Sequence, residues 1–314
     1  MGTPKRILIA IDTSSHALNA VRYLAFHCLR SDLEVRLFSI LSLGDEEVLR
    51  GVMMDEEFMR RMKERYRLYA LNCRQETEAF LEQCRTILVG YGFPESRVDV
   101  AIRQRQKGIA RDIIEEAGKG FDAVVVGRRG LGRVESILLG SVSNKVVQRL
   151  EHVPVWVIGG DVRAQKVLLA VDRSESSRKA VKYAAPFLAD SGAEVTLCHV
   201  VRAFLPTFGP DLIGSGGAME GEFVERLRED IGRMFDAYRD FLAGAGVRAE
   251  NISTVCKMGS YSRAADLLTT AREGGYGTIV MGRRGISAVR EFLMGRVTTK
   301  VLNGAEGLAI WVVP

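Results

Sequence analysis

Three glycines and a serine occur at spacings suited to holding an anion. Gly127 and Gly130 lie three residues apart, and nine residues separate Gly130 from the pair Gly140-Ser141. Because glycine has no Cβ, the backbone at such positions can turn sharply and come close to a ligand. The segment from Gly140 to Ser143 is expected to open a helix, where free N–H groups and the positive end of the helix dipole attract an anion. Two serine hydroxyls add hydrogen-bond donors, so a phosphate site is the first hypothesis.

The same pattern occurs twice along the 314-residue chain. The second set lies at a constant offset of 155 residues from the first: Gly282, Gly285 and Gly295. Asp12 and Asp172 likewise end the first apolar run of each half. A repeat of this length corresponds to one ordinary domain, which indicates a tandem duplication. We therefore predict two domains, residues 1–160 (copy one) and residues 161–314 (copy two).

Short runs of β-branched residues alternate with longer helical stretches in each copy, a pattern typical of βαβ units and a parallel sheet. The expected strands are Ile7–Ile11, Glu34–Ile40, Val98–Ile102, Ala123–Val126 and Val155–Ile158 in copy one, and Val167–Val171, Glu194–Val200, Ser253–Lys257, Thr278–Met281 and Ala309–Val313 in copy two. The predicted fold class is α/β, with two tandem open five-stranded parallel-sheet sandwiches. Ser14 and Ser174 are expected to cap the first helix of each copy.

The strand order decides whether these residues share a site. Ligands of open parallel sheets bind beyond the carboxyl ends of the strands, where the strand order reverses. We predict the order 3-2-1-4-5 in each copy, which reverses between strands one and four. Asp12 ends strand one and Gly127 follows strand four, so this order would bring both residues to one crevice.

The two copies differ after their second strands. Copy one carries a charged stretch from Asp45 to Arg74, with Met53, Met54, Met59 and Met62 at helical spacings. These methionines favour a core or helix-packing surface. Copy two carries a glycine-rich stretch from Phe204 to Gly221, which is expected to be a mobile loop.

Composition and charge exclude several classes of protein. The net charge is +5 and no Lys/Arg run reaches five residues, so nucleic acid is not an expected partner. The apolar run Ile7–Ile11 is too short to span a membrane or to serve as a signal peptide, so no membrane association is expected. Five cysteines without a C-x-x-C pair favour a reducing cytoplasm over a disulfide framework. The four histidines are scattered and do not suggest a metal site.

The sequence does not reveal a set of catalytic residues. There is no G-x-x-x-x-G-K-[ST] motif, and no nucleophile–base pair or pair of carboxylates stands at a site-like position. A phosphate cradle without a general base binds and holds its ligand, with weak ATPase activity at most. An interpretation without a ligand also stands, in which Ser141 is a helix N-cap, Gly140 is a packing glycine and Gly127–Gly130 is a β-turn.

The chain resembles the universal stress protein family in its tandem two-domain form. Nucleotide-binding members of that family carry G-x2-G-x9-G-[ST], which Gly127, Gly130, Gly140 and Ser141 match in full, and the similarity extends to the tail His152–Ile158. The resemblance implies a parallel α/β sandwich related to the adenine nucleotide α-hydrolases. It implies ATP or ADP as ligand, with Mg²⁺ as a candidate accompanying ion. It also implies a homodimer or self-association through the last strands.

The resemblance implies roles for individual residues as well. Asp12 would contact the adenine or ribose end, and Ile40 would offer its backbone to adenine. The base would be lined by Val126 and Gly127. Arg129 is a further candidate, and the ribose and phosphates would be held by Gly130, Gly140, Ser141, Val142 and Ser143. The counterparts in copy two are Asp172, Met281, Gly282, Gly285, Gly295, Arg296, Val297 and Thr298.

Arg296 is the departure of copy two from this pattern. It follows Gly295 where copy one has Ser141, whereas Thr298 matches Ser143. The long side chain could fold into the crevice and occupy the phosphate position, or turn outward and pair with a phosphate as a bidentate donor. We expect obstruction, because the family pattern has a small residue here.

Three functions remain open from the sequence. The favoured function is that of an adenine-nucleotide-binding stress-response regulator, whose nucleotide state alters its association with a protein partner of unknown identity. The alternatives are a scaffold protein with an empty crevice and a slow ATPase. The intact Gly140-Ser141 pair favours the regulator over the scaffold, and the lack of a general base disfavours the ATPase.

Overall fold

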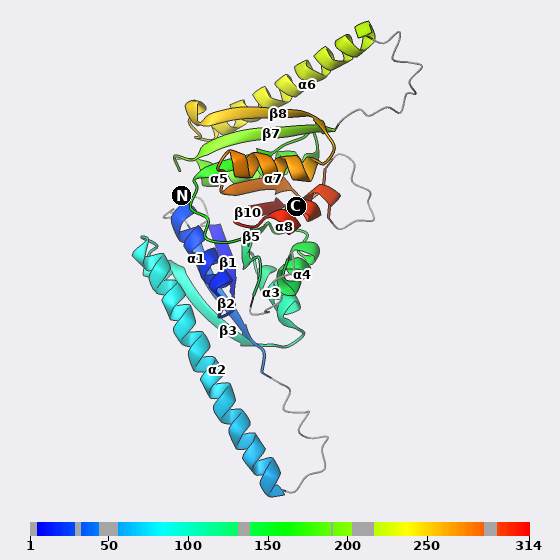
Figure 1. Ribbon diagram of the computed structural model, residues 1–314. Coiled ribbons are helices and arrows are strands. Elements are labelled where there is room, and N and C mark those ends of the chain that lie inside the picture. The colour runs from blue at the N-terminus through cyan, green and yellow to red at the C-terminus, as the bar shows by residue number, and fades with distance from the viewer. Residues whose placement is uncertain are drawn as a thin grey trace. The chain divides into compact units, whose positions relative to one another are not determined.

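The computed structural model describes residues 5–28, 33–43, 56–130, 139–189, 191–202, 217–285 and 294–314. The chain divides into two compact units, Met1–Asp161 and Val162–Pro314, whose helices and strands are drawn in Figure 1. Most of the glycine-rich stretch that was predicted to be a loop lies outside the described residues. Its last part, from Gly217 onward, is the start of a helix.

Unit one is built on five strands: β1 (Lys5–Ile11), β2 (Leu33–Leu41), β3 (Val98–Gln104), β4 (Ala123–Gly127) and β5 (Val155–Ile158). Their spatial order is β3-β2-β1-β4-β5, and each neighbouring pair is parallel. The predicted order is therefore confirmed for this unit, with its reversal between β1 and β4. The connecting helices are α1 (Ser15–His27), α2 (Glu56–Gly90), the short η2 (Glu95–Arg97), α3 (Ile109–Ala117) and α4 (Ser141–Arg149).

Unit two repeats this topology. Its strands are β6 (Lys166–Ala170), β7 (Glu194–Arg202), β8 (Ile252–Ser260), β9 (Thr278–Gly282) and β10 (Ala309–Val313). They lie in the order β8-β7-β6-β9-β10, again with parallel neighbours. The helices are α5 (Glu175–Leu188), α6 (Gly217–Gly244), the short η4 (Ala249–Asn251), α7 (Arg263–Glu273) and α8 (Arg296–Gly304).

All ten predicted strands are present, with ends within three residues of the prediction. The start of β1 illustrates the difference, because the strand includes Lys5 and Arg6. A charged pair interrupts an apolar pattern, so the sequence alone places the strand start after it. In the fold, the Arg6 guanidinium lies 4.5 Å from the centre of the Phe121 ring, and the Arg6 backbone N–H donates to Asp122 at 2.7 Å. These contacts accommodate a cationic side chain within the strand.

The first helix of each unit begins at the carboxyl end of a central strand. The hydroxyl of Ser14 accepts from the N–H of Ala17 at 3.3 Å, and that of Ser174 accepts from the N–H of Ser177 at 3.1 Å, so both predicted N-caps are confirmed. The predicted apolar stripe of α1 is buried: Ala17, Ala20, Val21 and Leu24. This packing holds the first turn of α1 beside β4.

The described part of the methionine-bearing stretch of copy one lies in α2. Met53 and Met54 lie outside the described residues, and Met59 and Met62 are only half-buried. The part of α2 that packs on the sheet is its C-terminal half, where Leu81, Cys84 and Leu88 are fully buried. Figure 1 shows the N-terminal half of α2 extending past the end of β3. Helical spacing alone does not distinguish these two halves.

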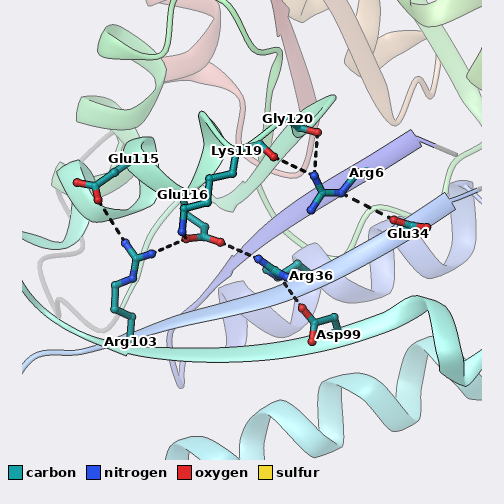
Figure 2. Close-up of polar contacts among 9 residues, drawn as sticks. All are labelled: Arg6, Glu34, Arg36, Asp99, Arg103, Glu115, Glu116, Lys119 and Gly120. Atoms are coloured by element: carbon teal, nitrogen blue, oxygen red, sulfur yellow. Dashed lines mark hydrogen bonds and ion pairs between the residues drawn. The ribbon is translucent and has the colours of Figure 1, made fainter. Parts of the chain in front are cut away.

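A buried carboxylate ties together one end of unit one (Figure 2). Glu116 on α3 is 2% exposed. Its two oxygens accept from Arg36 at 2.8 Å, from Arg103 at 2.7 Å and from Lys119 at 2.7 Å. Arg36 in turn contacts Asp99 at 2.6 Å. Since a buried charge is costly unless it is paired, this group depends on its three cations.

Unit two has uncharged side chains at three of the equivalent positions. Thr196 and Ser253 occupy the register positions of Arg36 and Asp99, and their hydroxyl oxygens lie 2.7 Å apart. Thr270 replaces the glutamate at the matching position of α7. The two copies thus share a backbone topology while differing in how their edges are held.

Replacing Glu116 with glutamine tests the contribution of this carboxylate. Burial by itself raises the pKa of Glu116, but the hydrogen bonds from Lys119 and Arg36 outweigh it and hold the pKa below its ordinary value. A depressed pKa means that the group stabilises the fold above its unfolded pKa of about 4.3, and that this stabilisation is lost as the pH falls through the folded-state pKa. We expect Glu116→Gln to lower the free energy of unfolding at neutral pH by about 1–3 kcal/mol.

The measurement is thermal unfolding of the full chain as a function of pH. The loss of stability in acid should be shallower in Glu116→Gln than in the unmodified protein. Glu95→Gln is the matched control, because the Glu95 side chain is 70% exposed in its pair with Arg85 and should change little. Identical acid profiles for the unmodified protein and Glu116→Gln would contradict this role.

Candidate functional site

The glycine motif of each copy lies between the end of the fourth strand and the start of the last helix. Gly127 ends β4 and Gly282 ends β9. Gly140 and Gly295 are the N-cap residues of α4 and α8, and neither helix receives a side-chain cap. By contrast, α1, α5 and α7 are each capped by a serine hydroxyl. Within the described residues, the first N–H groups of α4 and α8 therefore receive no acceptor from an N-cap side chain, and such N–H groups can bind an anion.

Two hydrogen bonds join each helix start to the strand before it. In copy one, the N–H of Gly140 donates to the carbonyl of Arg128 at 2.8 Å, and the Ser143 hydroxyl donates to the carbonyl of Gly127 at 2.6 Å. The Ser143 side chain is buried, and its single hydroxyl proton is given to the protein itself. The Ser143 hydroxyl therefore fixes the start of α4. The lone pairs of its oxygen remain available to accept a hydrogen bond.

Copy two makes the same pair of bonds. The N–H of Gly295 donates to the carbonyl of Arg283 at 2.9 Å, and the Thr298 hydroxyl donates to the carbonyl of Gly282 at 3.2 Å. Serine and threonine are interchangeable here because each offers one hydroxyl at the same place. The third residue of the helix thus serves the same purpose in both copies.

The first glycine of the motif faces the backbone of the first helix. A Cβ on Gly127 would lie 3.1 Å from the backbone of His16, and a Cβ on Gly282 would lie 2.7 Å from the backbone of Ser176. The close approach that was predicted from these glycines is therefore made, at this position, by the protein and not by a ligand. The packing-glycine interpretation and the phosphate interpretation are compatible.

The other two glycines also have close neighbours in the chain. A Cβ on Gly130 would overlap the Oδ2 atom of Asp12, and one on Gly140 would lie 3.2 Å from the carbonyl oxygen of Arg128. Asp12 accepts from the backbone N–H of Ser14 at 3.2 Å through its Oδ1 atom. Asp172 is held in the same way by Ser174, at 2.9 Å. The loop, the aspartate and the helix start thus form one compact unit.

A cavity of about 350 Å³ opens at this place in copy two. Its walls contain every residue that was predicted for the site of copy two: Asp172, Met281, Gly282, Gly285, Gly295, Arg296, Val297 and Thr298. The volume falls within the range of small-molecule pockets, about 300–1,000 Å³. The fold therefore brings together residues that are more than a hundred positions apart in the sequence.

The charged residues in the wall of this cavity are mainly arginines. Arg263, Arg284 and Arg296 line it together with one acidic residue, Asp172. The Nε atom of Arg284 is buried and has no hydrogen-bond partner among the described residues. Arg129, at the equivalent position of copy one, has a buried Nε atom in the same state. A buried donor of this kind is costly unless an acceptor reaches it, and an anionic ligand would supply one.

Arg296 lines the cavity of copy two, and its side chain is exposed. The cavity is open beside it. Obstruction of a phosphate by this residue stays a prediction, as does the outward alternative, in which the arginine pairs with a phosphate.

The residues predicted for copy one converge in the same manner. Asp12 directly follows β1, Ile40 lies near the carboxyl end of β2, and Val126 and Gly127 end β4. Arg129 and Gly130 follow in the loop, and Gly140, Ser141, Val142 and Ser143 form the start of α4. Ser141 is exposed and Val142 is half-buried, so both are accessible at the helix start.

Several residues of the copy-two cavity were not predicted from the sequence. Val200 could have been found, since it stands in β7 where Ile40 stands in β2. His199 and Arg263 gave no such signal, because Ser39 and Ile109 occupy their positions in copy one. The His199 Nδ1 atom lies 2.6 Å from the carbonyl of Val171. A carbonyl can only accept, so Nδ1 carries a proton and Nε2 of the neutral ring is left as an acceptor.

Cys198 also lines the cavity, and its environment makes it unreactive. Burial raises the pKa of its thiol to about 12. The thiolate is the nucleophilic form of cysteine, and it is scarce at neutral pH when the pKa is this high. Cys198 therefore acts as a small apolar residue of the wall.

Among the described residues, no cluster of three or more His, Cys, Asp or Glu side chains could hold a metal ion. Within the same part of the chain, no helix is long and apolar enough to cross a membrane.

Comparison with known proteins identifies the class to which this fold and glycine loop belong. The profile of the universal stress protein family matches residues 3–159 and again residues 163–314. A universal stress protein of Mycolicibacterium smegmatis is 25% identical over 307 residues, which cover 95% of this chain and 94% of that protein. One from Bacillus subtilis is 31% identical over 140 residues, which cover 43% of this chain and 90% of that protein.

A solved structure shows the same fold over the full length. The crystal structure of a universal stress protein from Archaeoglobus fulgidus superposes with a TM-score of 0.60 at 19% identity, covering 98% of this chain and 97% of the other. Two consecutive family matches span nearly the whole chain. The chain thus belongs to the universal stress protein family, in a tandem two-domain form.

Substituting alanine for Gly282 tests whether the first motif glycine is required by packing. The new Cβ would lie 2.7 Å from the Ser176 carbonyl carbon and 2.8 Å from its oxygen, so backbone must move to admit it. We expect a loss of about 1–3 kcal/mol in the free energy of unfolding, as for other overpacked sites. Gly232→Ala on α6 is the control, because a Cβ there meets nothing within 4 Å and should be neutral or stabilising. Equal melting temperatures for both variants would refute the packing role.

Proposed function

We propose that this protein binds ATP or ADP at the glycine motif of each copy and acts by nucleotide-dependent association with other proteins. The observation that carries the proposal is the uncapped start of α8 beside a cavity with an arginine-rich wall. Free helix N–H groups and nearby guanidinium groups are both suited to phosphate oxygens. The equivalent helix start in copy one, with the complete G-x2-G-x9-G-S motif, supports the same proposal there.

The other walls of the cavity suit a nucleoside. Leu267, Met281 and Val200 provide apolar surface against which a flat base can pack. His199 offers a ring nitrogen as an acceptor when it is neutral, and the amino group of adenine is a donor. Asp172 adds a carboxylate that can accept from ribose hydroxyls.

Two titratable groups of the cavity, an aspartate and a cysteine, favour binding over turnover. Asp172 accepts a backbone hydrogen bond from Ser174, and the Cys198 thiol has a pKa of about 12. Neither group is arranged as a general base against a positioned nucleophile. A nucleotide that is held without rapid hydrolysis can report its own concentration, as a regulator requires. Magnesium, where it accompanies ATP, would be carried by the phosphates.

Removing the arginines with buried donors tests the proposal at each copy. Titration of the full chain with ATP in a calorimeter should reveal two sites per chain. Arg284→Leu should weaken one of them and Arg129→Leu the other, each by about tenfold or more, because each variant removes a charged donor from a phosphate position. Arg149→Leu, which alters an exposed residue in the last turn of α4, is the matched control.

The outcomes separate the candidate functions. Saturable binding that both variants impair supports the nucleotide-binding regulator. A chain that takes up no nucleotide would point to the scaffold alternative, and steady release of phosphate at both sites would point to the ATPase. Binding that is indifferent to both arginines would refute the assignment of the phosphate positions.

A further inference from the structure

One arginine of the copy-two cavity lies outside the glycine motif. Arg263 is the first residue of α7, directly after the N-cap Ser262, whose hydroxyl accepts from the N–H of Ala265 at 3.4 Å. The Arg263 side chain lines the cavity. Its Nε atom is buried, and no described residue offers it a hydrogen bond. A buried N–H donor of this kind calls for an acceptor, and the described part of the chain provides none.

The position of α7 places this charge near the phosphate end of the site. Helices α7 and α8 pack against each other, and the first residue of each, Arg263 and Arg296, lines the same cavity. Arg284 from the loop after β9 adds a third guanidinium. Three guanidinium groups and one carboxylate give the cavity more positive charge than a single phosphate group needs. A chain of phosphates can pair with all three guanidinium groups.

Copy one differs at this position. The third strand starts at Val98 in copy one and at Ile252 in copy two, and the same offset of 154 residues matches Arg263 with Ile109. Ile109 is likewise the first residue of its helix, α3. An aliphatic side chain cannot donate a hydrogen bond to a phosphate. The two copies therefore differ in the residue that begins the helix after the third strand.

We propose that Arg263 is a phosphate-binding residue particular to copy two, which makes that copy select nucleoside di- and triphosphates over monophosphates more strongly than copy one does. This inference rests on the proposed function, since it concerns the same cavity. It assigns the two copies different ligand ranges. Copy two responds to the number of phosphate groups on the nucleotide, and copy one responds less to it.

The test exchanges the two residues between the copies. The full-length protein, Arg263→Ile and Ile109→Arg are titrated with ATP, ADP and AMP by calorimetry. In Arg263→Ile, the ratio of ATP affinity to AMP affinity at one site should fall by about ten- to a hundredfold, the value of a lost charge-assisted hydrogen bond. The other site should keep its ratio. In Ile109→Arg, the ratio at copy one should rise.

A second variant separates charge from packing. Arg263→Gln keeps a polar side chain but removes the charge, and it should lower the ATP-to-AMP ratio as Arg263→Ile does. A loss in the isoleucine variant that the glutamine variant does not share would assign the effect to packing and overturn the proposal. Thermal unfolding without nucleotide provides a check on folding. Both variants should melt at or above the temperature of the unmodified protein, because they remove a buried donor that has no partner.

The result also distinguishes this inference from the function on which it rests. Nucleotide binding with ATP-to-AMP ratios that are unchanged in all three variants would overturn the role of Arg263 alone. An unmodified protein that binds none of the three nucleotides would overturn the proposed function and this inference together.

Discussion

The contact between one strand end and one helix start determines the geometry of each site. Gly127 lies against the backbone of His16, and Gly282 lies against that of Ser176, at distances that leave no room for a Cβ. The carbonyl of the same glycine accepts the hydroxyl of Ser143 or Thr298, which fixes where the last helix begins. The first N–H groups of this last helix, α4 or α8, receive no cap from the side chain of the N-cap residue. They lie at the reversal of the strand order, where parallel sheets bind ligands. A substitution at this glycine would therefore disturb the fold and the site together.

Both copies share this contact between a strand end and a helix start, but the residues around it differ. In copy one, Glu116 and its three cations hold the outer strands, whereas copy two has hydroxyl side chains at the positions of Glu116, Arg36 and Asp99. Likewise, copy two has Arg263 at the cavity where copy one has an aliphatic residue. Under the proposed function, duplication followed by such changes would give one chain two phosphate sites of different selectivity. Self-association through the last strands, β5 and β10, stays a prediction.

Much of the fold could be predicted from the sequence, because β-branched runs, serine caps and the offset between glycines are local signals. Part of the site could be predicted for the same reason, because the glycine motif contains the residues that the loop and the helix start bring together. His199 and Arg263 could not be found in this way, since their importance arises only when β7 and α7 are folded beside the motif. The direction of the Arg296 side chain could not be predicted either, because the direction of a long side chain depends on its surroundings, which the residue type does not specify. Met59 and Met62 are half-buried on α2, which agrees with the packing surface expected for them, and helical spacing alone does not say how far such a surface is covered.

The central claim is that the uncapped starts of α4 and α8 bind the phosphates of a nucleotide. Amide chemical shifts measured by NMR during titration of the full chain with ATP test it most directly. The account predicts that the largest shifts fall on the backbone N–H groups of residues 141–143 and 296–298, since these donors would gain phosphate acceptors. Saturable ATP binding that leaves both segments unshifted, with the largest changes elsewhere, would contradict it.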